Sequence, residues 1–286
     1  NRTEGIFAYG VLCAAPEELS PQLIIYAGAR RRNGDFMRFI IIDKKALAYM
    51  LCAAAAAIII PVCAKTAVYA AKSLKPLPIY CVQKEEKEVA VTFDSAWGNE
   101  DLNEILDTLD KYGCKATFFV VGDFLDKYPE SVKEMHKRGH EIANHSDNHA
   151  HYSKLSREQM TADMDACDAK IKKITGKDNK LFRPPYGEYT DLSVKTCEET
   201  GRYSIQWDCD SLDWKGLMPK EMEQRILKRV KCGSIILLHN GAKHTAEALP
   251  GILNSLKNEG YAFKTVSELI YKDNYTIDHT GMQIKN

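Results

Sequence analysis

The sequence predicts an α/β fold in which a single (β/α) barrel, or a distorted version of one, makes up most of the chain. Two observations predict it. From about Glu88 onward, strand-like and helix-like segments alternate in six or seven units, the order typical of a parallel barrel. The first strand, Val89 to Phe93, is a nearly continuous apolar run, as expected of a strand buried on both faces of a parallel sheet.

The remaining elements follow from short apolar runs and from helical spacing. The later strands are expected at 116–121, 141–144, 180–183, 203–207 and 234–238. Apolar residues three and four positions apart predict the helices, and Gly113 and Gly139 end two of them. The expected helices are 99–111, 129–138, 156–174, 191–200, 219–230 and 245–258, and a last short strand and helix fall within 262–271.

Composition excludes several classes of protein. Lys plus Arg equals Asp plus Glu, 39 each, so no net charge recruits nucleic acid or an anionic membrane. The nine Cys include no CxxC pair, which argues against a structural zinc site and a dense disulfide framework, while one or two disulfides remain open. We expect no nucleic-acid partner, and the sequence implies no protein partner.

The apolar run Ala46 to Ala64 carries the targeting information. It has no charged residue and follows Arg38, Lys44 and Lys45. Small residues near its end suit signal peptidase, and the run is long enough to span a bilayer if it stays uncleaved. A buried Ala-rich helix is the alternative. Cleavage and anchoring both place the rest of the chain outside the cytoplasm, either secreted or attached to the cell membrane.

These segments give an expected domain layout. An N-terminal signal or anchor helix precedes the barrel, and a linker that contains Pro76 and Pro78 separates the two. The expected boundaries are 1–36 for an unassigned extension, 37–64 for the signal peptide or anchor, 65–87 for the linker, 88–272 for the barrel domain and 273–286 for a tail.

Polar residues follow the ends of two predicted strands, the position where barrels keep their chemistry. Asp94 follows the first strand, and His145 and His149 follow the strand 141–144. The i, i+4 spacing predicts both imidazoles on one face of a helical turn, where two neighbouring ligands can hold a divalent cation. Taken alone, an HxxxH pair is often placed by chance, and an Asp after a strand often caps the next helix.

Three later clusters extend this pattern. Arg183 begins the rigid turn RPPYG, where its guanidinium can fix a carboxylate through two hydrogen bonds. The run Trp207 to Gly216 crowds three Asp between two Trp, which suits a sugar ring but also a solvated acidic loop. His239 ends the apolar strand IILL. Together the clusters predict a metal-dependent hydrolase with a base, a cation and an imidazole acid.

Five motifs of the chain resemble, in their residues and in their order, those of the polysaccharide deacetylase family, the NodB-homology domain of carbohydrate esterase family four. The motifs are TFD, HSxxH, RPPYG, DSLDW and LLH. The resemblance covers about Glu88 to Tyr271. It implies a distorted (β/α) barrel of the NodB-homology type that removes acetyl groups with a divalent cation, zinc being the expected metal. The implied substrate is an N-acetylated cell-wall polysaccharide, either peptidoglycan or a chitin-like glycan.

The resemblance also assigns roles to the residues of these motifs. It implies that Asp94 is the catalytic base and His239 the catalytic acid. Arg183 would orient the base, and Asp213 would pair with the acid. The other implied roles are metal binding by His145 and His149, an oxyanion contact from the main-chain N–H of Tyr186, and lining of the acetyl pocket by Trp214 and Leu237.

Ser95 departs from the family's pattern, in which a second Asp follows the base and completes an Asp-His-His metal set. A neutral hydroxyl is a poorer ligand for a divalent cation than a carboxylate. The SAWG continuation is similar to a subgroup from spore-forming Gram-positive bacteria with the same loss. Glu100, Asp101 and Asp147 are candidates for a replacement ligand. The alternative function is a catalytically silent glycan-binding relative.

Overall fold

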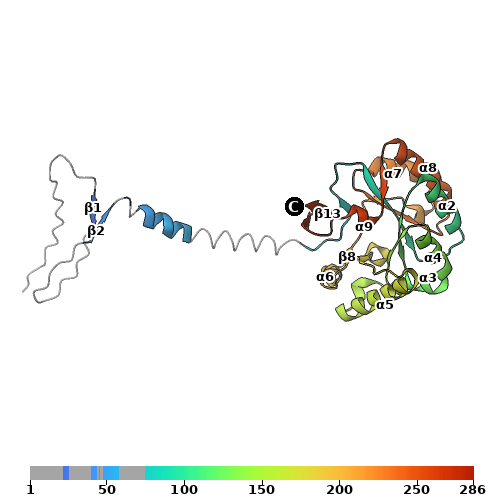
Figure 1. The fold of residues 1–286 in the computed structure, drawn as a ribbon, viewed down its shortest axis with the longest axis horizontal. Coiled ribbons are helices and arrows are strands. Elements are labelled where there is room, and N and C mark those ends of the chain that lie inside the picture. The colour runs from blue at the N-terminus through green and yellow to red at the C-terminus, as the bar shows by residue number, and fades with distance from the viewer. Residues whose placement is uncertain (1–21, 26–39, 44, 46–47, 58–74) are drawn as a thin grey trace, which may run out of the picture. The chain divides into compact units, whose positions relative to one another are not determined.

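The computed structural model describes residues 22–25, 40–43, 45, 48–57 and 75–286 (Figure 1). The chain divides into two compact units, Asn1–Leu74 and Lys75–Asn286. In the first, strands β1 (Gln22–Ile25) and β2 (Ile40–Asp43) pair antiparallel, and residues 48–57 are helical. The predicted apolar run at 46–64 lies partly outside the described residues. Among those described, no helix is both long enough and apolar enough to cross a membrane, and the signal or anchor stays a prediction.

The second unit is built around a curled sheet in which every pair of strands is parallel (Figure 1). The strand order is β8-β7-β6-β5-β4-β10-β9, with β11 also paired to β4. Within this sheet β8 and β9 are the two ends and do not pair, so the barrel is open between them and the predicted distorted (β/α) barrel is confirmed. The bounds are β4 (Glu88–Ser95), β5 (Thr117–Val120), β6 (Glu141–Asn144), β7 (Leu181–Phe182), β8 (Tyr203–Ser204), β9 (Cys209–Asp210), β10 (Ile235–His239) and β11 (Ala262–Lys264).

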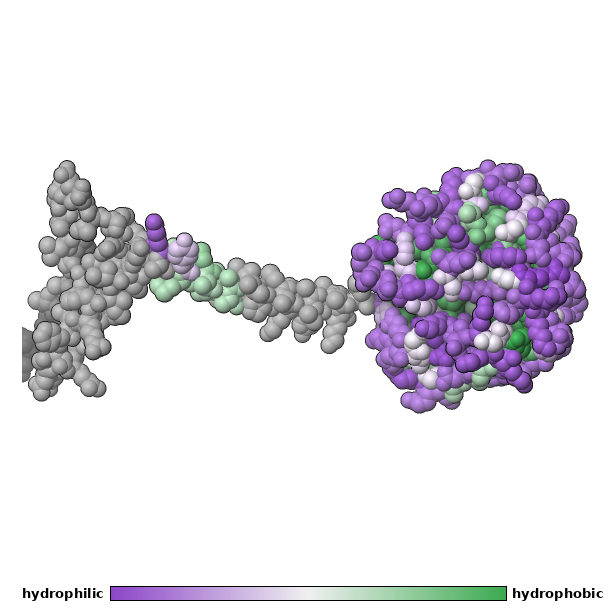
Figure 2. All heavy atoms as spheres, in the orientation of Figure 1, coloured by the Kyte–Doolittle hydropathy of each residue, from purple (hydrophilic) through white to green (hydrophobic). Residues whose placement is uncertain are grey.

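Helices surround the sheet and supply the outer part of the core (Figure 1). Their bounds are α2 (Leu102–Tyr112), α3 (Gly122–Lys127), α4 (Pro129–Lys137), α5 (Arg157–Thr175), α6 (Asp191–Glu199), α7 (Pro219–Arg229), α8 (Thr245–Asn258) and α9 (Val266–Leu269). Val91 and Phe93 of β4 pack into one apolar cluster, and Ala90 packs into another. Strand β4 is therefore buried on both faces, as its continuous apolar run predicts. The face of this unit seen in Figure 2 is mostly hydrophilic.

A small three-stranded sheet corrects the predicted linker and tail. Strand β13 (Met282–Lys285) pairs with β12 (Tyr275–Ile277) and, in parallel, with β3 (Cys81–Val82). The side chain of Gln283 is fully buried, and its amide accepts a hydrogen bond from the Tyr271 N–H and donates one to the Tyr271 carbonyl, both at 2.8 Å. The folded unit therefore includes the end of the predicted linker and the whole predicted tail.

Strand register brings the motif residues to one edge of the sheet. Strand β10 pairs with β4 so that His239 lies opposite Asp94. Strand β6 ends at Asn144, directly before His145, and β7 ends directly before Arg183. Because all these strands are parallel, their carboxyl ends meet at the same end of the barrel. None of the cysteines that the structure describes forms a disulfide.

Candidate active site

A cavity of about 260 Å³ opens at the carboxyl ends of the strands. It collects most of the residues that the sequence predicts for the site, and Arg183 and Asp213 lie behind it as hydrogen-bond partners of Asp94 and His239. The side chains and backbone that line it come from Asp94, Ala96, Trp97, His145, His149, Tyr186, Gly187, Trp207, Asp210, Trp214, Leu237 and His239.

Asp94 is held as a buried carboxylate. Arg183 Nη1 donates to Asp94 Oδ1 at 2.7 Å and to Thr92 Oγ1 at 2.9 Å, and Nη2 donates to the Gln206 carbonyl at 3.1 Å. Burial opposes ionisation, but the Arg183 charge and two nearby imidazoles outweigh it and lower the pKa of Asp94. The carboxylate is therefore ionised near neutral pH, as a general base must be.

The two predicted metal ligands lie side by side as neutral imidazoles. The His145 Nδ1–H donates to the Arg183 carbonyl at 2.8 Å, which leaves Nε2 with its lone pair, 3.5 Å from Asp94 Oδ2. The His145 and His149 rings have centroids 5.1 Å apart. Burial lowers the pKa of His145, and burial together with His145 lowers that of His149 to about 4. Neutral imidazole is the form that binds a metal, and a backbone carbonyl on Nδ1 is a common support for such a ligand.

The helical turn predicted for this pair is wrong. Residues 145–151 form an irregular loop in which Ser146 and His149 have positive φ, 76° and 53°. The Ser146 N–H donates to Asn144 Oδ1 at 2.8 Å, and the Ala150 N–H donates to Ser146 Oγ at 3.2 Å. These side-chain acceptors replace the backbone acceptors of a helix. The loop still brings both imidazoles to the cavity.

Ser95 is fully buried beside Asp94, and its hydroxyl oxygen has no hydrogen-bond partner among the residues that the structure describes. The candidate replacement ligands lie elsewhere. Asp101 accepts from the Gly241 N–H at 2.9 Å, Asp147 pairs with Lys170 at 2.7 Å, and neither these residues nor Glu100 line the cavity. No group of three His, Cys, Asp or Glu side chains among the described residues could hold a metal ion. The described residues therefore offer a divalent cation the two imidazoles of His145 and His149, which suit the ion but lack the carboxylate that an Asp at position 95 would supply.

His239 is held by a carboxylate with several donors. Its Nδ1–H donates to Asp213 Oδ1 at 2.8 Å and its main-chain N–H to Oδ2 at 2.6 Å, while Thr245 Oγ1 and the Trp214 N–H also donate to Asp213, both at 2.8 Å. Burial opposes the charged imidazole, but Asp213 and Asp94 outweigh it and raise the pKa of His239. The raised pKa favours the imidazolium form, whose Nε2–H is the proton that a general acid requires.

Aromatic side chains form the rim of the cavity. Trp97, Tyr186 and Trp214 are 58%, 59% and 55% exposed. The Trp97 ring lies 6.0 Å from that of His149 and 6.2 Å from that of His239, so it spans the mouth between them. Trp97 was not among the predicted site residues, whereas Trp207 and Asp210 belong to the run 207–216 that the sequence singles out, without a role of their own. The available sequence signal for Trp97 was a Trp two residues after the end of a strand, close behind Asp94.

A parallel barrel whose cleft combines an ionised carboxylate, two neutral imidazoles and a third imidazole of raised pKa has the make-up of a hydrolase. Comparison with known proteins identifies the kind of hydrolase. The family model described as polysaccharide deacetylase matches residues 82–205. Over 197 residues the chain is 32% identical to the peptidoglycan-N-acetylmuramic acid deacetylase PdaA of Bacillus subtilis, covering 68% of this chain and 75% of PdaA. It is 37% identical to a peptidoglycan-N-acetylglucosamine deacetylase of Bacillus cereus, covering 66% of this chain and 91% of that protein. The chain belongs to the polysaccharide deacetylase family.

Other matches are to an uncharacterized protein and to a pseudoenzyme of the same family. The chain is 35% identical to YlxY of Bacillus subtilis, an uncharacterized protein, of which it spans 62%. The solved structure of a wild-type CE4 family pseudoenzyme from Bacillus anthracis has a TM-score of 0.66 and 32% identity, with 70% of this chain and 71% of that chain covered. A mutant of that pseudoenzyme, described as having restored enzymatic activity, gives a TM-score of 0.66 at 33% identity, with 70% and 74% covered.

Proposed function

We propose that this chain removes acetyl groups from an N-acetylated cell-wall polysaccharide, peptidoglycan or a chitin-like glycan. The observation that carries the proposal is the pairing of Asp94 and His239 across one cavity, each with a buried partner that favours the protonation state its role needs. The relatives named as peptidoglycan deacetylases support the substrate class.

The proposed reaction is a hydrolysis in which base and acid act in turn. Asp94 takes a proton from the water that attacks the acetyl carbon, and Arg183 keeps the carboxylate ionised and oriented. His239 gives its Nε2 proton to the departing sugar amine, so acetate and a free amine leave. Asp213 holds the imidazolium in place.

The remaining residues of the cavity position the substrate in this scheme. Leu237 and Trp214 flank the acetyl methyl group, and the Tyr186 main-chain N–H donates to the oxyanion. Tyr186 has φ 61°, and its ring stacks on His151 at 4.3 Å, which fixes the turn that presents the N–H. His145 and His149 would hold the divalent cation, zinc being the expected metal. When bound, such an ion polarises the acetyl carbonyl and acidifies a water molecule.

The pH dependence of acetate release tests the assigned base and acid. We expect a bell-shaped profile of kcat/KM. Because the pKa of Asp94 is lowered, activity should be lost only on strong acidification. Because the pKa of His239 is raised above 6.5, activity should persist above pH 6.5 and fall as the imidazole deprotonates.

Asp213→Asn removes the main cause of the raised pKa of His239 and should move the alkaline limb of the profile to lower pH. Asp191→Asn, at an exposed position on α6, is the control. An alkaline limb that stays in place in Asp213→Asn would contradict the role of His239.

A second candidate function is favoured by Ser95 and by the likeness to a CE4 family pseudoenzyme. In this alternative the chain keeps the cleft and its aromatic rim, binds glycan and releases no acetate. Assays with chitin oligomers and peptidoglycan at saturating zinc distinguish the two. Glycan binding without acetate release would favour the glycan-binding function over the deacetylase function.

We also propose that the barrel lies outside the cytoplasm, secreted or anchored through the apolar run at 46–64. A protease added to intact cells should then degrade the barrel while cytoplasmic marker proteins stay intact, or the barrel should be recovered from the medium. Protection of the barrel together with the cytoplasmic markers would contradict export.

A further inference from the structure

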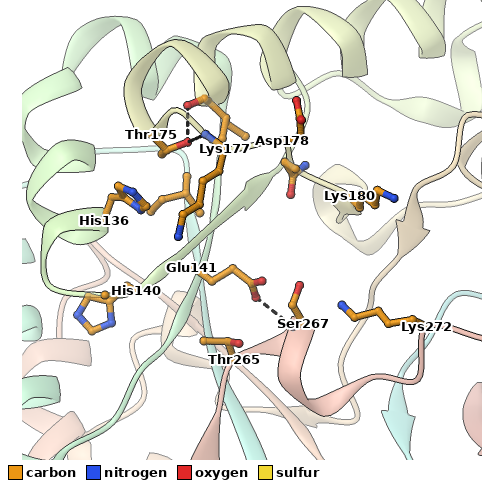
Figure 3. A pocket seen from close by; sticks show the side chains of 14 residues that line it. His136, His140, Glu141, Thr175, Lys177, Asp178, Lys180, Thr265, Ser267 and Lys272 are labelled. Carbon is orange, nitrogen blue, oxygen red and sulfur yellow. Dashed lines mark hydrogen bonds between the residues drawn. The ribbon is translucent and has the colours of Figure 1, made fainter.

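A second cavity, of about 400 Å³, opens at the other end of the barrel (Figure 3). Its lining includes the first residues of β6, the turn 175–180 that follows α5, and residues on both sides of α9. The Val266 N–H donates to Thr117 Oγ1 at the start of β5, at 2.9 Å. Because parallel strands begin at this end, the cavity lies opposite the candidate active site and shares no lining residue with it.

The charges around this cavity are unbalanced. Lys177, Lys180 and Lys272 line it, and none of the three has a carboxylate within ion-pair distance among the residues that the structure describes. Partial desolvation lowers the pKa of Lys272; the Glu141 carboxylate opposes this shift, and the Lys180 charge adds to it.

The two acidic residues that line the cavity are already engaged. Glu141 Oε2 accepts from Thr117 Oγ1 at 2.8 Å and from the Ser267 N–H at 3.1 Å. Asp178 pairs with Lys172 at 2.8 Å, and Lys172 is not among the lining residues. The lining thus carries three lysines against one carboxylate, Glu141, that no described cation pairs with, and the cavity keeps a net positive charge.

Hydrogen-bond donors accompany the charge. Figure 3 shows Lys177 and Lys272 reaching inward from opposite sides, with Glu141 and Ser267 between them. The Ser267 hydroxyl makes no side-chain hydrogen bond within the described part of the chain. Lysines act as point charges toward phosphate, and hydroxyl groups supply additional donors.

From this arrangement we infer that the cavity is a binding site for a phosphate group. Its volume suits a small anionic group, and its lysines gain the counter-charge that the protein does not supply. The site has two possible sources of phosphate. Free phosphate is one source, and the phosphate of an anionic lipid headgroup is the other.

Titration of the full chain with inorganic phosphate tests the site, with calorimetry as the readout. Removing two charged donors in the double variant Lys177→Gln, Lys272→Gln should weaken phosphate binding by at least about tenfold. Lys195→Gln, at an exposed position on α6, is the matched control and should bind as the unchanged chain does. Acetate release should be the same in all three proteins, because the cavity is remote from the cleft.

Vesicles distinguish the two sources of phosphate. The same proteins are sedimented with phosphatidylglycerol vesicles and with phosphatidylcholine vesicles, so the N-terminal part is identical in every comparison. If the double variant loses the binding of inorganic phosphate, the site is assigned to soluble phosphate. If the double variant sediments less with phosphatidylglycerol vesicles but not with phosphatidylcholine vesicles, the site is assigned to a lipid headgroup. If the double variant equals the Lys195→Gln control in both assays, the phosphate site is refuted, whatever the deacetylase assay shows.

Discussion

Replacement of His239 by Ala is expected to lower acetate release by at least about a hundredfold, the lower end of a general acid's contribution. Without the imidazole, no group in the cavity has a raised pKa and lies opposite Asp94 to protonate the departing amine. Zinc content should not change, since His239 Nδ1 is bonded to Asp213 rather than turned to the metal site. Acetate release and bound zinc are measured on the same preparation of the full chain.

The Ala variant keeps the main-chain N–H but removes the Nδ1–H that donates to the buried Asp213 carboxylate, so stability must be separated from chemistry. His239→Gln keeps a side-chain donor, and thermal unfolding reports whether either variant is folded. His279→Ala, at an exposed position near the C-terminus, controls for the loss of a histidine. A folded His239→Ala protein with normal turnover would remove His239 from the mechanism.

Replacement of Ser95 by Asp is expected to raise zinc affinity by about an order of magnitude or more, because a charged carboxylate adds a Coulomb attraction that a hydroxyl lacks. The same change buries a carboxylate at a position where Ser95 Oγ has no partner. Without metal this should lower the melting temperature, and zinc should restore it. Competition with a chelator measures the affinity, and unfolding with and without zinc gives a readout independent of turnover.

Ser95→Asn is the matched control, since it has nearly the size of Asp without the charge. His149→Ala should abolish zinc binding in the native chain and be partly rescued by Ser95→Asp. Higher affinity together with higher turnover would mean that metal occupancy limits the native enzyme. Higher affinity with no turnover would favour the glycan-binding function. Unchanged affinity would mean that another group already completes the set, and the site built on His145 and His149 alone would be wrong.

The sequence predicts the barrel well because its signals are local. The apolar run of β4 and the i, i+3, i+4 spacing of α8 depend on neighbouring residues, and α8 spans Thr245–Asn258 as expected. The loop from His145 to His149 was mispredicted because its conformation depends on hydrogen bonds from Ser146 and Ala150 to side chains rather than on residue spacing. The residue spacing predicted that the two imidazoles lie side by side, but not the conformation of the backbone that joins them.

Contacts between distant segments account for what the sequence did not reveal at the site. Thr245 donates to Asp213 across 32 positions, and Asn240 Nδ2 donates to the Gly98 carbonyl at 2.6 Å across 142 positions. The second bond ties the segment that follows Trp97 to the end of β10. Such pairs leave no periodic pattern, and only the fold shows which residues meet.

The pairing of β3 with β13 decides where the folded unit can be cut. A recombinant fragment limited to the motif-bearing region, about 88–271, would lack both strands and the Gln283 amide that caps the Tyr271 backbone. Such a fragment would leave backbone groups of the barrel unpaired at its surface, an edge that recruits other chains and promotes self-association. Fragments that begin at Lys75 and extend to Asn286 keep the first and last strands together, and this boundary suits crystallisation and assay work on the isolated barrel.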